Sequence, residues 1–262
     1  MATLSSGSGV CLPKHGRVEC DLCHAGQPYG FDRVRTQGDG WRITNNPLAW
    51  GNRKPEILVL GFSKGPTQAG ALASQPHDSI AYRGGRTNLA KILHHVGLLP
   101  SADPQLVDQA IADPMGRFHF GSLIRCTVER FDAKQDQWSG TGGGMLDKFI
   151  ATDFGKSVVS KCASQFLGTL PSETRLVLML GMGAGGNYVR ACRKLFSLIR
   201  PGSWREVNEV SYTDGRVTVV HTEHFQSQGA LIPNWLSGDR HERGRLGELS
   251  RAGVAFALRT RA

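Results

Sequence analysis

Short apolar runs alternate along the chain with segments in which apolar residues recur at helical spacing. The apolar runs lie at residues 57–60, 117–128, 174–181 and 216–225. A continuous apolar run of this kind, bounded by turn residues, is typical of a strand buried on both faces of a parallel sheet. The pattern therefore predicts about four core strands.

Helical segments separate and follow these runs. Residues 86–99 place four apolar side chains on one helical face, namely Leu89, Ile92, Leu93 and Val96. Further helices are expected at 103–114, 147–170, 185–199 and 243–258. Strands that alternate with helices indicate an α/β fold, and we expect three layers, α/β/α, around a mostly parallel central sheet. Ligands in such folds bind at the carboxyl ends of the strands.

The chain is expected to form a single domain over residues 1–262. Residues 1–54 are loop-rich, carry three of the six cysteines, and contain no periodic segment long enough to build a core. Residues 132–146, which include the sequence SGTGGG, are expected to form a flexible insertion.

The hydrophobic content, 40% of all residues, is ordinary for a globular protein. No apolar run approaches the roughly 20 residues of a membrane-spanning helix, and the first residues lack the apolar core of a secretory signal. We therefore expect a cytoplasmic protein with no membrane contact. In that compartment cysteines are thiols or metal ligands rather than disulfides.

Cys20 and Cys23 form a Cys-x-x-Cys pair followed directly by a histidine. Such a pair is compatible with haem attachment, half of a zinc site, or two ligands of an iron–sulfur cluster. Attachment of haem normally follows export, which disfavours the first. Cys126 and Cys162 supply two more thiols, and four thiolates from separated segments suit a [4Fe–4S] cluster. A structural zinc site usually has two close pairs, and this chain has only one.

Two cysteines remain, Cys11 and Cys192. Apolar residues surround Cys192 on its predicted helix, so we interpret it as a small buried hydrophobic residue. Cys11 is a spare ligand or has no role.

The chain is basic, with 31 Lys and Arg residues against 22 Asp and Glu residues, a formal charge of +9. An excess of this size favours an anionic partner, most commonly nucleic acid. The alternative is a basic composition without a specific partner.

The cysteines stand in a particular order relative to the strands and loops. Cys-x-x-Cys comes first and is followed by a strand ending in "VLGFSKGPT" and by the helix start "AYRGGRTNLAKIL". The next strand ends in "SLIRC", and a further cysteine lies one helix later. The segment "HTEHFQS" follows the last strand. Over residues 18–230 this order resembles that of the iron–sulfur (thermostable-type, family four) uracil-DNA glycosylases, members of the uracil-DNA glycosylase superfamily.

The resemblance implies a hydrolase of base excision repair that cleaves the N-glycosidic bond of a deaminated or modified base in double- or single-stranded DNA. It also implies a structural [4Fe–4S] cluster held by Cys20, Cys23, Cys126 and Cys162, with zinc as the alternative metal. We expect such an enzyme to be a monomer.

Enzymes of this kind extrude the base from the stack and hold it in a pocket. By resemblance, Tyr82 stacks on the base, and the backbone around Gly61 and Gly65 lines the pocket. Ser122 stands in the place of the base-reading Asn, and His224 stabilises the departing base as negative charge develops on it.

Leu231 or Ile232, in the loop 226–235, is expected to be the wedge that fills the vacated stack.

Three positions depart from the family's pattern. Phe62 replaces the acidic residue of the first loop, Phe225 replaces a proline after the loop histidine, and Ser122 replaces the Asn. Phe62 lines the predicted pocket but has no carboxylate to hold a water. Asp78 and Glu223 are the residues that we name as possible substitutes.

Two main hypotheses follow. The first is a DNA glycosylase with altered substrate choice, and the second is a non-catalytic iron–sulfur module that binds nucleic acid, which Phe62 favours. A third hypothesis is an α/β zinc protein that acts on small nucleotides. Base release from damaged oligonucleotides separates the first two, and metal analysis tests the third.

Overall fold

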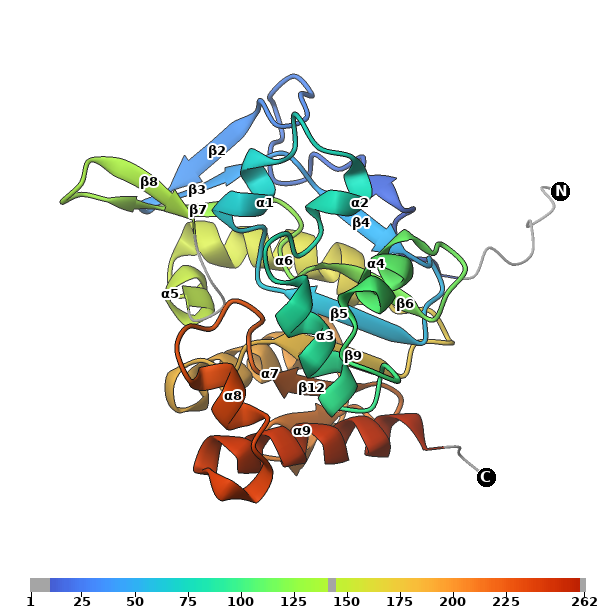
Figure 1. The fold of residues 1–262 in the computed structure, drawn as a ribbon. Coiled ribbons are helices and arrows are strands. Elements are labelled where there is room, and N and C mark those ends of the chain that lie inside the picture. The colour runs from blue at the N-terminus through green and yellow to red at the C-terminus, as the bar shows by residue number, and fades with distance from the viewer. Residues whose placement is uncertain (1–9, 141–144, 260–262) are drawn as a thin grey trace, which may run out of the picture.

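A computed structural model describes residues 10–140 and 145–259 of the chain. Its centre is a mixed sheet of eight strands in the order β1-β4-β6-β5-β9-β12-β11-β10 (Figure 1). The four middle strands run parallel to one another and are β6 (Phe118–Ser122), β5 (Ile57–Gly61), β9 (Leu176–Leu180) and β12 (Thr218–Thr222). These are the four strands that the apolar runs predict, and nearly all their residues are buried.

The expectation of about four strands in the sheet is wrong, because short antiparallel strands extend both edges. One edge gains β4 (Leu48–Gly51) and β1 (Gly16–Arg17), and the other gains β11 (Ser211–Thr213) and β10 (Arg205–Asn208). Each has at most four residues, too few for a hydrophobic period to be recognised in the sequence.

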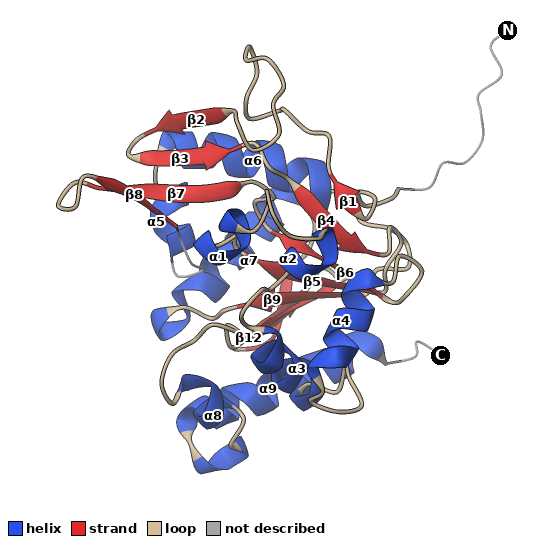
Figure 2. Cartoon of the chain, turned by 45° about the horizontal axis from the view of Figure 1, so that its top comes forward, coloured by secondary structure: helices blue, strands red, loops and turns tan. Residues whose placement is uncertain are grey.

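A second sheet was not expected. It is antiparallel, with the order β2-β3-β7-β8, and lies above one end of the main sheet (Figure 2). Its strands are β2 (Arg35–Gly38), β3 (Trp41–Thr44), β7 (Thr127–Asp132) and β8 (Gln137–Gly140). Trp41 and Ile43 are buried in the core, so the interpretation of residues 1–54 as loops that build no core is wrong.

Helices cover both faces of the main sheet (Figure 1). Helices α3 (Arg86–His95), α4 (Pro104–Ala112) and α9 (Glu242–Leu258) lie on one face, and α6 (Asp153–Leu167) and α7 (Asn187–Ile199) lie on the other. The shorter helices are α1 (Pro66–Gly70), α2 (His77–Ile80), α5 (Leu146–Ile150), α8 (Leu231–Trp235) and the 3-10 turns Ala184–Gly186 and Gly238–Arg240. In the described ranges, none of these helices has the length and apolarity needed to cross a membrane.

Two long predicted elements are divided. The strand expected at 117–128 ends at Ser122, and the chain then crosses to the second sheet, where β7 begins at Thr127. The helix expected at 147–170 is interrupted at Thr152, whose side chain accepts a hydrogen bond from Gly155 N–H and so caps α6. Within the expected insertion 132–146, β8 pairs with β7, and residues 141–144 lie outside the described residues.

Buried His221 predicts that the fold is less stable in acid. Its Nδ1–H donates to Gly181 O at 2.9 Å, and its Nε2 accepts from the Tyr212 hydroxyl at 3.2 Å. Burial lowers the pKa of His221 to about 4. Between the unfolded pKa of about 6.5 and this value, only the unfolded chain binds the proton, so the free energy of unfolding falls by about 1.4 kcal/mol per pH unit as the pH is lowered.

Urea unfolding at pH 7 and pH 4.5 measures this effect. In His221→Gln, which cannot titrate, the free energy of unfolding should differ less between the two pH values than in the wild type. In His94→Gln, where the histidine is exposed, the difference should equal that of the wild type. If the free energy of unfolding of His221→Gln changes with pH as much as that of the wild type, His221 is not the cause of the acid sensitivity.

Candidate functional site

A cavity of about 190 Å³ lies at the carboxyl ends of β5 and β6. It is lined by the loop after β5, the end of β6, the turn after α2 and the loop after β12, and its residues are Trp50, Gly61, Phe62, Ser63, Gly65, Pro66, Gln68, Tyr82, Gly121, Ser122, Gly140, His224, Phe225 and Gln226. The six residues expected around the pocket, Gly61, Phe62, Gly65, Tyr82, Ser122 and His224, are among them, whereas the expected wedge residue is not. Leu231 begins α8 and is 38% exposed, while Ile232 beside it is buried.

Tyr82 is held rigidly in the wall of this cavity. Its hydroxyl donates to Val59 O at 3.1 Å, with Gly121 O at 3.3 Å as a second acceptor. Its φ of 52° is unusual for a residue with a bulky side chain, and such strain persists only where surrounding contacts enforce it. Burial raises the pKa of Tyr82, so the ring is neutral. Tyr82 therefore presents a fixed aromatic surface.

Phe225 shares this wall, as its position directly after the loop histidine implies. Its ring meets Tyr82 edge-on, 5.1 Å between centroids, and lies 4.5 Å from the ring of His224. A Cβ at Gly85 would come within 2.2 Å of the Phe225 ring, so only glycine at position 85 admits this packing. The Phe225 ring thus becomes part of the cavity wall.

His224 lines the cavity and has one ring nitrogen that bonds nothing else in the described chain. Gln226 N–H donates to its Nδ1 at 3.2 Å, so in the neutral ring the proton is on Nε2. Burial lowers the pKa of His224, which Glu223 raises only in part, so the ring is neutral at pH 7. In the described part of the chain Nε2–H has no acceptor. It is a hydrogen-bond donor available to a group in the cavity.

Glu223 positions this loop and does not line the cavity. Its Oε1 accepts from His224 N–H at 3.0 Å and from the Ser227 hydroxyl at 2.6 Å, and Oε2 accepts from Arg243 at 2.6 Å. Burial opposes its charge, but these hydrogen bonds outweigh burial and lower the pKa of Glu223. Both carboxylate oxygens are used within the protein.

Asp78, the other named substitute for the missing acid, pairs with His15 at 2.9 Å away from the cavity. Among the described residues, then, no Asp or Glu lines the cavity, and Phe62 fills the expected acidic position as a buried ring.

Several polar groups of the cavity wall have no partner within the described ranges. They are the Ser63 hydroxyl, the Gln68 amide and the Ser122 hydroxyl. Of the three, only the Ser63 hydroxyl is fully buried, whereas the Gln68 amide and the Ser122 hydroxyl are open to the cavity and can bond a polar ligand there. Ser63 and Gln68 were not expected from the sequence, which offers no signal for the direction of a side chain in a short loop or helix.

The four expected ligand cysteines line a second, apolar cavity. Cys20 and Cys23 come from the N-terminal segment, Cys126 from the crossing between the two sheets, and Cys162 from α6. Burial raises the pKa of Cys23 and of Cys162 to about 12, and also raises that of Cys126. As bare thiols these groups would be neutral at pH 7.

Two buried cations adjoin these thiols. Lys64 donates to Arg125 O, and Arg125 N–H donates to Cys162 Sγ at 3.4 Å. Burial lowers the pKa of Lys64 to about 8, and Arg125 lowers it further, whereas Cys126 and Cys162 would raise it if they were ionised. Neither cation forms an ion pair with a carboxylate in the described chain.

Among the described residues the sulfurs do not form a compact tetrahedral site, and their spacing identifies no metal. A tetrahedral zinc ion, with bonds of about 2.3 Å, brings its four sulfurs to about 3.8 Å from one another. No three cysteine sulfurs of the described residues lie within 4.8 Å of one another. A [4Fe–4S] cluster holds its thiolates farther apart because each binds a different corner of the core.

The group of potential metal ligands that does meet this distance is His15, His77 and Asp78. The imidazole nitrogens of this group already have neighbours within the protein: Gly51 N–H donates to His15 Nδ1 at 3.2 Å, and His15 Nε2 lies 2.9 Å from Asp78 Oδ1. His77 Nε2 donates to Ala49 O at 3.0 Å. We interpret the group as a network that ties the N-terminal segment to α2.

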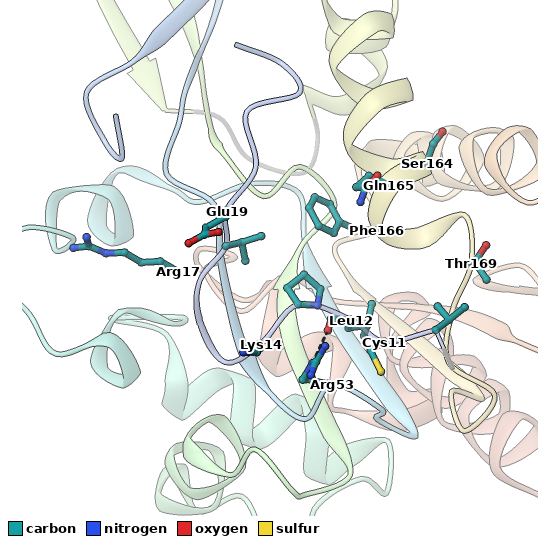
Figure 3. A pocket seen from close by; sticks show the side chains of 13 residues that line it. Cys11, Leu12, Lys14, Arg17, Glu19, Arg53, Ser164, Gln165, Phe166 and Thr169 are labelled. Carbon is teal, nitrogen blue, oxygen red and sulfur yellow. Dashed lines mark hydrogen bonds between the residues drawn. The ribbon is translucent and has the colours of Figure 1, made fainter. Parts of the chain in front are cut away.

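The remaining cysteines lie elsewhere. Cys11 lines a separate groove with Lys14, Arg53 and Phe166, between the N-terminal segment and the end of α6 (Figure 3). Cys192 is fully buried on α7, as the apolar residues around it predict.

No model of a protein family matches this chain, and no curated protein matches it either.

Proposed function

We propose that the protein is a DNA glycosylase of the uracil-DNA glycosylase type, which hydrolyses the N-glycosidic bond of a deaminated or modified base. The observation that carries the proposal is the cavity at the carboxyl ends of β5 and β6. There a fixed aromatic surface, unpartnered polar groups and the Nε2–H of His224 face one volume of the size of a single base.

In this reaction the bond between C1′ and the base nitrogen breaks, and its electron pair leaves with the base. His224 Nε2–H donates to a carbonyl oxygen of the base and is most effective as negative charge develops there. Water then adds at C1′ and releases its proton to solvent. A donor fixed by Gln226 and Glu223 requires little reorganisation during the reaction.

The absence of a carboxylate from the described cavity wall favours a dissociative route. Tyr82 and Phe225 exclude water and hold the extruded base, while the departing anion is stabilised by His224. Water attack needs no strong base once the sugar carries positive charge.

We further propose that Cys20, Cys23, Cys126 and Cys162 hold a [4Fe–4S] cluster. The donor set is all cysteine, it lines one apolar cavity, and two buried cations without a carboxylate partner adjoin it. Four thiolates bound to iron would provide the negative charge that balances the buried cations Lys64 and Arg125. The cluster would join the N-terminal segment to α6 and to the crossing between the sheets, a structural role.

The proposal predicts base release by the wild-type protein. Single- and double-stranded oligonucleotides with uracil, hypoxanthine, xanthine or hydroxymethyluracil at one position are incubated with the protein, and alkali then cleaves abasic sites. We expect strand breaks at the modified base and none in an oligonucleotide of normal bases. Preparations that bind every oligonucleotide but release no base would contradict it.

That contrary outcome defines the second candidate, a non-catalytic module that binds nucleic acid. Phe62 favours it, because a buried ring stands where the related enzymes carry an acid. Such a module should bind DNA with an affinity that falls steeply as salt is raised, since phosphate contacts release counterions.

A further inference from the structure

Gln68 is the least expected polar residue of the cavity. It lies in α1, directly after the loop that follows β5, and is the buried residue of that helix, with 9% of its surface exposed. It lines the same cavity as Tyr82 and His224. A polar side chain therefore occupies the inward position of this helix, where an apolar residue is usual.

The Gln68 amide has no hydrogen-bond partner in the ranges that the structure describes. Its backbone N–H is used, donating to Gly65 O at 3.1 Å, but the side-chain oxygen and nitrogen are not. The two amide atoms are not among the fully buried polar atoms of the described chain, so they are open to the cavity, where a ligand could replace water as their hydrogen-bond partner.

Gln68 is better suited than Ser122 to recognise a planar ring. A hydroxyl offers one proton and rotates freely, whereas an amide offers an acceptor and a donor side by side in one plane. That pair matches a ring N–H next to a carbonyl, the arrangement at N3 and C4 of uracil. Two coplanar hydrogen bonds would then satisfy both amide groups.

We propose that Gln68 reads the N3–C4 edge of a uracil-type pyrimidine whose O2 accepts from His224 Nε2–H, an inference that rests on the proposed function. The volume of about 190 Å³ admits a single base, and uracil carries a second carbonyl, O2, on the side of N3 opposite C4, so one ring can engage Gln68 and His224 together. Because an amide can rotate by half a turn, Gln68 holds this edge but does not by itself reject cytosine.

Binding, measured apart from catalysis, tests the inference. Two oligonucleotides with the same flanking sequence carry 2′-fluoro-2′-deoxyuridine or its N3-methyl derivative; the fluorine suppresses cleavage, and the methyl group removes the N3–H. The wild type should bind the first roughly 10- to 100-fold more tightly, the range expected for a buried amide left unpaired. Gln68→Met should bind both equally.

Two control variants accompany Gln68→Met. Gln105→Met, on the exposed side of α4, should keep the wild-type discrimination. Gln68→Glu keeps the shape but replaces the donor with a second acceptor, so it should bind the uridine probe less tightly than the wild type. Melting temperatures of all variants establish that they are folded.

The inference is overturned if Gln68→Met discriminates as the wild type does, or if the wild type binds both probes equally. The same experiments distinguish a failure of the role of Gln68 from a failure of the proposed glycosylase activity. Gln68-dependent binding without base release from the non-fluorinated oligonucleotide overturns catalysis alone. Base release at equal rates by the wild type and Gln68→Met overturns only the role of Gln68.

Discussion

Replacement of His224 by alanine should lower the rate of base release by roughly 100- to 1000-fold, the usual cost of removing a fixed donor from a site of developing negative charge. The effect is expected to be large because His224 lines the cavity and its loop holds the Nε2–H donor in place. Single-turnover rates on a uracil-containing oligonucleotide measure it. Binding of the same oligonucleotide should change much less, since the donor matters most after the bond begins to break.

Because His224 acts as a neutral ring, the rate of base release should depend on pH in a particular way. Burial lowers the pKa of His224, so lowering the pH through that pKa protonates Nδ1 and removes the acceptor for Gln226 N–H. The wild-type rate should be flat around pH 7 and fall in acid. His224→Gln keeps a side-chain donor, and should recover part of the rate without this fall.

His94→Ala is the matched control, because His94 is exposed on α3 and distant in the fold from the cavity-lining loops. It should retain the wild-type rate and pH profile. If His224→Ala releases the base at the wild-type rate, His224 has no role in the reaction.

The sequence predicts the centre of this fold well and its periphery poorly. The runs that became β5 and β9 are continuous and apolar because helices cover both faces of these strands, and that burial is visible in composition alone. Strands β2 and β3 owe their pairing to each other and to β7, more than 80 residues from Trp41. Four-residue segments with mixed polarity carry no periodic signal of such contacts.

The same distinction holds at the cavity. The order of motifs along the chain suffices to bring Gly61, Ser122 and His224 to one edge of the sheet, because parallel strands end at the same edge. The direction of the Gln68 side chain depends on how a five-residue helix packs, and the position of Phe225 depends on the space left by Gly85. Neither is encoded in a local pattern.

Substitution of Cys126 by serine should remove the metal and destabilise the whole domain. Loss of one thiolate would leave the buried charges of Lys64 and Arg125 without compensation, and breaking a buried ion pair costs about 3–5 kcal/mol. In a chain of this size that loss lowers the melting temperature by on the order of 10 °C. Iron and sulfide content and visible absorbance of protein purified without oxygen measure the cluster.

Cys192→Ala separates loss of the metal from loss of packing. Cys192 is more deeply buried than Cys126 but lies on α7, outside the cavity of the four cysteines. Its removal should lower the melting temperature through a small cavity while iron and sulfide remain at wild-type content. If wild-type protein holds zinc or no metal, or if Cys126→Ser and Cys192→Ala hold equal iron, the four thiols do not bind a cluster, and the charges of Lys64 and Arg125 require another partner.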